Sequence, residues 1–326
     1  MMKLGRYRLS NLGRWQGVPI ALGLIVIFIV LRAIDPAPIE VMRLRVFDMF
    51  QKVQPRDRPV APVVIVDIDE KSLKELGQWP WPRNRIGELV EKIAEAKALI
   101  IGFDILFPEE DRLSPKQFVK NFPDLSEQVR AHLESLPSND TRLAESFSKT
   151  TVVLGMAALR PGEGGVAAPD FTRTPSREVG DDPRPYLPTY SKVIHSIPEI
   201  ASKARGHGVI SAVPEYDGVV RRLPMVFSID GHLVPSLAME ILRLAAGQKH
   251  FTVETDASGV RAVGVGAKMV PTAPDGRVWL HFTRHEPGRY VSAADVLSGA
   301  VPAKRLANHI VLIGSTGLGI ADFITT

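Results

Sequence analysis

Residues 63–70 read Val-Val-Ile-Val-Asp-Ile-Asp-Glu (VVIVDIDE), a β-branched run that ends in acidic residues. Buried parallel strands show this pattern where they reach the carboxyl edge of a sheet. Residues 85–97 follow with apolar side chains at helical spacing, and residues 98–106 (ALIIGFDIL) form a second apolar run. The three segments predict a right-handed β-α-β unit.

The chain after this unit predicts further helices and short strands. Residues 114–149 are expected to be helical with breaks at Pro123 and Pro137, and residues 151–157 to form a third buried strand. Residues 159–198 are rich in proline and glycine, which predicts a long loop. Asp217-Gly218 is a dipeptide typical of hairpins, so strands 208–213 and 219–229 are expected to pair around it.

The last third completes the predicted fold. We expect a helix at 235–246, short strands within 251–282, short helices at 292–297 and 302–307, and a buried strand at 309–313. The fold class is therefore α/β over residues 60–326, with a mixed, mainly parallel sheet and flanking helices.

An uncharged segment, GVPIALGLIVIFIVL, occupies residues 17–31. Extended to residue 34 it is near the lower limit of about 17 residues for a membrane-spanning helix. Basic residues precede it, so residues 1–16 are expected in the cytoplasm and the chain after Arg32 outside. A cleaved signal peptide is the main alternative, but Asp35, Pro36 and Pro38 stand where cleavage would fall. A buried core helix is disfavoured because the segment has no polar face.

Residues 37–54 predict an amphipathic helix after the span. Its apolar side chains recur every three or four residues, at Ile39, Met42, Val46, Met49, Phe50 and Val53. A stalk leading away from the membrane and a helix packed on its own domain both use such a stripe, so both interpretations remain open.

The composition excludes several classes of function. With 326 residues, 45% hydrophobic and 23% charged, the chain can bury a sizeable core. The net charge of +4 does not indicate nucleic-acid binding, because Lys3, Arg6, Arg8 and Arg14 crowd the N-terminus. The chain has no cysteine, which excludes disulfides, thiolate zinc sites and cysteine nucleophiles.

Acidic residues at the ends of predicted strands form the candidate ligand site. Asp67 and Asp69 stand at the end of the first predicted strand and Asp104 at the end of the second, and we expect these strands to be adjacent, with their carboxyl ends at one sheet edge. Asp322, after the last strand, is expected to join them. A divalent cation or a cationic ligand could bind there. The favoured interpretation is that these carboxylates cap helices and pair with Arg83 or Arg221.

Arg83 follows Trp79-Pro80-Trp81-Pro82 at a predicted helix N-terminus. Free backbone N–H groups and an arginine could bind an anion there, so Arg83 is included among the candidate ligand-binding residues. Proline-fixed tryptophans also suit a packed structural corner, which is the favoured interpretation.

Motifs of catalysis and metal binding are not complete. The Gly314–Gly319 segment GSTGLG lacks the Lys-Ser/Thr ending of a phosphate loop and the spacing of a nucleophile elbow. His281 and His285 lack the glutamate of a metalloprotease helix. We therefore predict no catalytic residue, no metal ligand and no cofactor in this chain.

Six motifs in one order carry a family resemblance: VVIVDIDEKSLKELGQWPWPR, IIGFDILFPE, YDGVVRRLP, VPSLAMEIL, SAADVLSG and HIVLIGSTGLGIAD. From about residue 40 to 326 the chain resembles the second type of CHASE domain. The resemblance implies an extracytoplasmic sensory domain of a bacterial receptor in the inner membrane, with the main domain in the periplasm. It also implies a small-molecule or protein signal and a homodimer as partners, and no nucleic acid.

Receptors of this kind usually continue into membrane helices and a cytoplasmic class III nucleotide cyclase, histidine kinase or diguanylate cyclase. This chain stops at Thr326, so it is expected to be a fragment without the output domain, and the parent is expected to be an enzyme, foremost a class III adenylate or guanylate cyclase. The alternatives are a dimerisation or scaffolding module that senses nothing and, more weakly, a periplasmic hydrolase. An open cleft around Asp69, Arg83 and Asp104 would favour ligand binding over scaffolding.

Overall fold

The computed structural model describes residues 12–34, 36–55, 62–160, 162–170 and 173–317. The chain divides into two compact units, residues 1–56 and 57–326, and each is described by itself.

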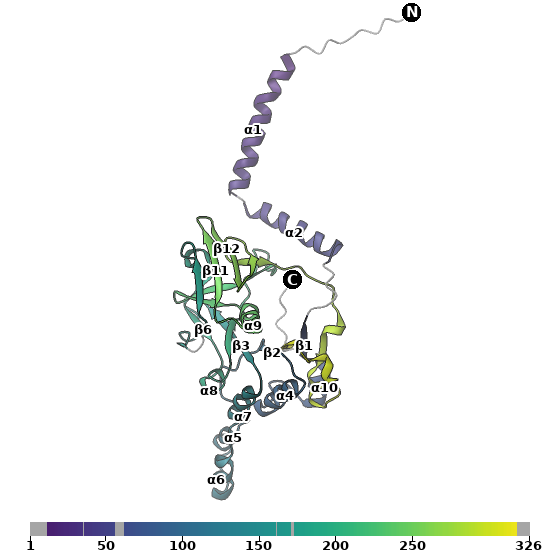
Figure 1. The fold of residues 1–326 in the computed structure, drawn as a ribbon, viewed down its shortest axis with the longest axis vertical. Helices are drawn as coiled ribbons and strands as arrows, with labels where there is room; N and C mark the ends of the chain where they lie inside the picture. Colours follow the sequence, from purple (N-terminus) through teal and green to yellow (C-terminus); the bar gives the residue numbers. More distant parts are fainter. Residues whose placement is uncertain (1–11, 35, 56–61, 161, 171–172, 318–326) are drawn as a thin grey trace, which may run out of the picture. The chain divides into compact units, whose positions relative to one another are not determined.

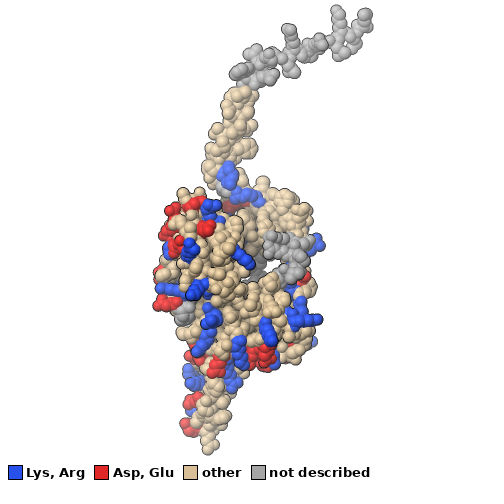
Figure 2. All heavy atoms as spheres, in the orientation of Figure 1, with Lys and Arg blue, Asp and Glu red and all other residues tan. Residues whose placement is uncertain are grey.

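The first unit contains two helices, α1 (Leu12–Ile34) and α2 (Ala37–Val53). Within α1, the 18 residues Gly17–Ile34 are long and apolar enough to cross a membrane, and none of them is buried. Figure 2 shows this helix almost without charged side chains. Pro36 is the N-cap of α2 and a second proline stands in its first turn, where a missing N–H costs no hydrogen bond. The expected amphipathic helix therefore forms, and its role as stalk or packing helix stays a prediction.

The second unit is built on a seven-stranded sheet with the order β15-β1-β16-β2-β3-β6, and β7 also pairs with β3 (Figure 1). Every pairing in it is parallel except that of β6 with β3. Its strands are β1 (Val63–Ile68), β2 (Ile100–Phe103), β3 (Val152–Leu159), β6 (Lys192–Ile194), β7 (Gly206–Val209), β15 (Tyr290–Ser292) and β16 (Ile310–Ser315). The expected mixed, mainly parallel sheet is confirmed.

Successive side chains of each strand point to opposite faces of this sheet, and both faces are packed against other elements. On one face Ile101 and Phe103 join a core that includes residues of α4 (Arg83–Glu95), α7 (Asn139–Ser146), α8 (Pro198–Ala201) and α10 (Ala293–Leu297). On the other face Ile100 and Val153 pack with Ile241 of α9 (Leu237–Ala245). Both faces are therefore covered, which explains why the parallel strands are continuous apolar runs.

Three short helices complete the α-helices of the described residues. α3 (Glu70–Leu76) lies between β1 and α4, and α5 (Pro115–Asn121) and α6 (Glu127–Ser135) lie between β2 and β3. Figure 1 shows α5 and α6 projecting from the rest of the unit, and no residue of α6 is buried. The helical interpretation of residues 114–149, with breaks at Pro123 and Pro137, is confirmed.

Smaller sheets form a second region of the unit. A four-stranded sheet has the order β13-β12-β11-β4, a three-stranded sheet β10-β9-β5, and a two-stranded sheet β14-β8. Their bounds are β4 (Ser176–Val179), β5 (Thr189–Tyr190), β8 (Arg222–Pro224), β9 (Val226–Ile229), β10 (His232–Pro235), β11 (Phe251–Asp256), β12 (Gly259–Val265), β13 (Lys268–Pro271) and β14 (Arg277–Trp279). The segment 159–198 is thus not loop throughout, because β4, β5 and β6 lie within it.

The hairpin expected around Asp217-Gly218 is wrong. β7 pairs with β3 and β8 pairs with β14, so the strands on either side of this dipeptide do not pair with each other. The hairpin forms instead at Asp230-Gly231, between β9 and β10. Both turn residues have positive φ, 48° and 73°, which the primed hairpin turns require.

Candidate functional site

The carboxyl end of β1 places Asp67 beside the end of β16. The register pairs Asp67 with Gly314, and two residues later Thr316 reaches back to the carboxylate. Thr316 donates from its hydroxyl to Oδ2 at 2.6 Å and from its backbone N–H to Oδ1 at 3.0 Å. Asp67 is only 7% exposed, so this carboxylate mainly fastens the last strand to the first.

Asp69 is the N-cap of α3. Its Oδ1 accepts from the backbone N–H of Ser72 at 2.8 Å and from the hydroxyl of Ser292 at 2.8 Å. Side-chain oxygens at this position satisfy N–H groups that the first helical turn leaves free. Asp69 therefore joins α3 to β15, as the capping interpretation predicted.

The two carboxyls differ in their proton affinity. Burial raises the pKa of Asp67 despite the hydrogen bonds from Thr316, and the nearby Asp69 raises it further. For Asp69, burial also favours the neutral form, but the hydrogen bonds from Ser72 and Ser292 outweigh it and lower the pKa. Two carboxyls with separated pKa values are therefore present at this sheet edge.

Asp104 follows β2 and is exposed. The expectation that the first two strands are adjacent is wrong, because β16 lies between β1 and β2. The ends of β1 and β2 are therefore about 10 Å apart, twice the spacing of neighbouring strands. Asp322 lies outside the described residues. The structure thus brings Asp67 and Asp69 together and leaves Asp104 one strand further along the edge.

Arg83 stands apart from these carboxylates. Its backbone N–H, at the N-terminus of α4, donates to Oδ2 of Asp111 at 2.8 Å, and its guanidinium pairs with Asp140 at 2.5 Å. Its expected pairing with the strand-end aspartates is therefore wrong. The helix N-terminus already holds a carboxylate of the chain itself, which favours the interpretation of a structural corner.

The tryptophans before Arg83 pack as that interpretation requires. Trp81 is 3% exposed and its indole N–H donates to the carbonyl of Gly77 at 2.8 Å. Trp79 meets it edge to face, with ring centroids 5.7 Å apart.

The other candidate arginine, Arg221, is among the most deeply buried side chains and forms two hydrogen bonds with Asp217, both at 2.8 Å. This contact lowers the pKa of Asp217 to about 2. The sequence signal for it was the four-residue spacing of Asp217 and Arg221 in the YDGVVRRLP motif. The YDGVVRRLP motif therefore stabilises the turn at Asp217-Gly218 through an ion pair within the motif.

A buried ion pair on α9 was not anticipated. Glu240 is fully buried and Arg243 is 8% exposed; their side chains bond at 2.6 and 2.8 Å. Gly206 lies against Glu240, and a Cβ at this position would clash with the carboxylate. The three-residue spacing in VPSLAMEILRL was the only sequence signal, and such a spacing is also common on exposed helix faces.

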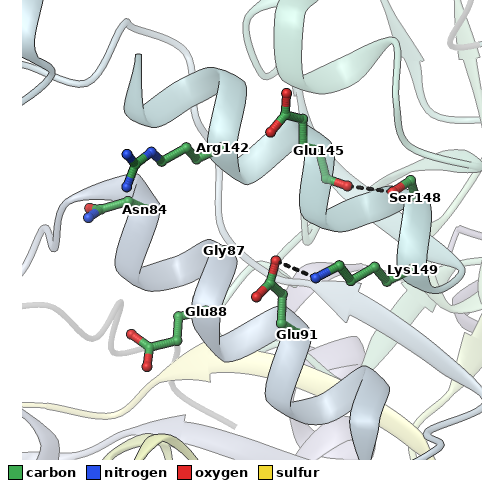
Figure 3. Close-up of a pocket in the computed structure, with 8 residues that line it drawn as sticks. All are labelled: Asn84, Gly87, Glu88, Glu91, Arg142, Glu145, Ser148 and Lys149. Carbon is green, nitrogen blue, oxygen red and sulfur yellow. Dashed lines mark hydrogen bonds and ion pairs between the residues drawn. The ribbon is translucent and has the colours of Figure 1, made fainter. Parts of the chain in front are cut away.

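A polar cavity of about 470 Å³ lies between α4 and α7 (Figure 3). The helices approach closely at Gly87, where a Cβ would be 3.4 Å from the carbonyl oxygen of Arg142. Lys149 reaches across to Glu91 at 2.8 Å. The remaining charged side chains here are of both signs, so the cavity does not favour one class of ligand.

Metal coordination has no candidate group: among the described residues, no three His, Asp or Glu side chains are placed to hold an ion. His281 and His285 are both exposed.

In the described residues an α/β domain follows one helix long and apolar enough to cross a membrane, which fits a membrane protein. The family model of the CHASE2 domain matches residues 21–326, and the chain belongs to this family. CHASE2 is a family of extracytoplasmic sensory domains, not of catalytic ones, so the chain is a sensory domain without enzymatic activity of its own. No curated protein and no solved structure matched the chain.

Proposed function

We propose that the chain is the input domain of a bacterial signalling receptor of the inner membrane, with residues 57–326 in the periplasm. A signal bound there changes the arrangement of α1 and α2 and so regulates a cytoplasmic enzyme outside residues 1–326. A class III nucleotide cyclase is the first expectation for this enzyme, and a histidine kinase or diguanylate cyclase the next.

One observation carries this proposal. The CHASE2 match begins within α1 and continues through the α/β domain, so the membrane-length helix and the sensory domain belong to one family module. Basic residues before α1 favour a cytoplasmic N-terminus, which puts the α/β domain on the other side.

The absence of cysteine allows a direct test of this topology. Tyr216 is 80% exposed, so a Tyr216→Cys variant should react with a membrane-impermeant maleimide in intact spheroplasts. A Ser10→Cys variant is the matched control and should react only after the membrane is permeabilised. The opposite pattern of labelling would contradict the proposed topology.

We further propose that the receptor is a homodimer whose copies meet along the apolar stripe of α2. Val46 lies within this stripe and Gln51 lies on the other side of the helix. Oxidation should therefore cross-link Val46→Cys between copies in membranes far more than Gln51→Cys. Equal cross-linking of the two variants would contradict a stripe-to-stripe dimer.

The same cross-link tests signalling. The proposal expects oxidised Val46→Cys to change the output of the parent receptor several-fold and to abolish its response to a signal. Unchanged output in the locked dimer would favour the second candidate function, a scaffolding module. This candidate is supported by the sheet edge itself, where Asp67 and Asp69 already bind partners of the chain.

A further inference from the structure

The amino ends of β3 and β7 enclose a second cavity, of about 520 Å³. It lies at the sheet edge opposite to Asp67 and Asp69, because all these strands run parallel. Residues 147–151, before β3, form one wall, and residues 202–205, between α8 and β7, form the other. No carboxylate is among the residues that line it.

The two walls are held together by strand pairing. Parallel pairing of β3 with β7 sets Val153 opposite Gly206, and the backbone N–H of Arg205 donates to the carbonyl of Val152 at 2.9 Å. On the other side of β3, the carbonyl of Thr151 accepts from Ile101 at 2.9 Å. The fold thus fixes the main chain of both walls, while Arg205 and Lys203 are exposed.

The charges of the cavity have one sign. Lys149, Lys203 and Arg205 line it, and only Lys149 has a carboxylate partner, Glu91, which belongs to the neighbouring cavity. Across the described residues, the side chains of Lys203 and Arg205 have no hydrogen bond or ion pair. Two cations held near each other without a counter-charge disfavour each other and favour a bound anion.

Hydroxyl groups supply further donors. In the described part of the chain, the hydroxyls of Thr150, Thr151 and Ser202 make no hydrogen bond, and all three residues line the cavity. The basic residues are not needed to cap α8, because the carbonyls of Pro198, Ile200 and Ala201 accept backbone N–H groups of the turn that follows. The cavity therefore offers donors and positive charge with no acidic competitor.

We propose that this cavity binds the oxyanion group, phosphate or carboxylate, of a small extracytoplasmic ligand. Arg205 presents the planar fork that binds such groups through two parallel hydrogen bonds, and Lys203 adds a point charge. The hydroxyls complete the shell around the anion. As a ligand class for the sensory domain this inference rests on the proposed function, but the binding step can be measured without it.

Binding is tested on the whole chain in detergent, by calorimetric titration with inorganic phosphate, sulfate and citrate at constant ionic strength, with sodium chloride as the blank. At least one of these anions should bind with a dissociation constant of roughly 1 mM. Comparing the affinity for phosphate and sulfate with that for citrate shows whether the cavity prefers a tetrahedral oxyanion or a carboxylate. The double variant Lys203→Gln/Arg205→Gln should weaken binding about tenfold or more.

The control is Arg177→Gln/Lys268→Gln, which removes the same charge from two exposed positions on the four-stranded sheet. This control should bind like the unchanged chain, and circular dichroism should show that both double variants are folded. The proposal fails if no anion binds above the chloride blank, or if the two double variants bind equally. Neither result alters the labelling of Tyr216→Cys, so failure of this site is distinguishable from failure of the proposed topology.

Discussion

Asp67 and Thr316 bind each other through two hydrogen bonds, of 2.6 and 3.0 Å, across 249 residues of sequence. They stand just inside the first and just after the last strand of the α/β unit, β1 and β16, which lie side by side. The contact therefore links the first and the last strand of the described part of this unit.

The Thr316→Val variant should lower the free energy of unfolding by about 1–3 kcal/mol, because it leaves a buried carboxylate oxygen without its donor. Urea denaturation followed by circular dichroism measures this change. Thr316→Ser keeps the hydroxyl and should cost clearly less. Equal losses in the two variants would show that the hydroxyl does not stabilise the unit.

The Arg83→Ala variant should destabilise the unit by about 3–5 kcal/mol, since it leaves the buried Asp140 without its charge partner. Arg142 is exposed on α7, and Arg142→Ala is the matched control with little expected change. The same denaturation experiment compares the two. A stable Arg83→Ala variant that no longer responds to signal would instead identify Arg83 as a ligand-binding residue.

Glu240→Leu should cost about 3–5 kcal/mol, because Arg243 then stays buried and uncompensated. Replacing both residues, in Glu240→Leu/Arg243→Met, should restore much of this loss, since a well-packed apolar pair has no charge to desolvate. A double-mutant cycle on the free energy of unfolding measures the coupling. A double variant less stable than Glu240→Leu alone would contradict this account.

His207 should make the unit less stable in acid. Burial, together with His195 nearby, lowers the pKa of His207 to about 4 from its usual 6.5, although a hydrogen bond with the backbone of Ala201 opposes the shift. Between these pH values the unfolded chain binds more protons than the folded one. The stability is therefore complete above pH 6.5 and falls by about 3 kcal/mol as the pH drops towards 4.

Denaturation at a series of pH values tests this prediction. His207→Gln should remove much of the slope between pH 6.5 and 4. His232 is exposed on β10, and the control variant His232→Gln should keep the same slope of stability against pH as the unchanged chain. Parallel pH curves for the unchanged chain and His207→Gln would assign the acid sensitivity to other groups.

Local patterns in the sequence predicted which segments form strands. They predicted less well which strands lie side by side. The apolar runs at β1, β2, β3 and β16 are correctly identified as strands, because burial on both faces demands continuous apolar residues. The insertion of β16 between β1 and β2 could not be predicted, because the residues of a strand do not specify which other strand it pairs with. The expected grouping of Asp104 with Asp67 was wrong for this reason.

The turns and ion pairs show the same limit. The Asp-Gly dipeptides at 217–218 and 230–231 are near each other in sequence, and of these two only the second joins paired strands, because β7 pairs with β3 and β8 with β14. Arg83 contacts Asp111, in the loop between β2 and α5, through its backbone N–H, and Asp140, on α7, through its guanidinium. The pairing with Asp140 therefore depends on the packing of α7 on α4, which the sequence pattern does not reveal.

The neighbouring positions of β1 and β16 have a mechanical consequence. These parallel strands are paired over six positions, from Val63 with Ile310 to Ile68 with Ser315. A pull between the residues before β1 and those after β16 would act along the strands and load the rungs of this ladder in shear, all at once and not one after another. The unit would therefore transmit tension between its two ends as a stiff link, while the smaller sheets outside this path carry none of the load.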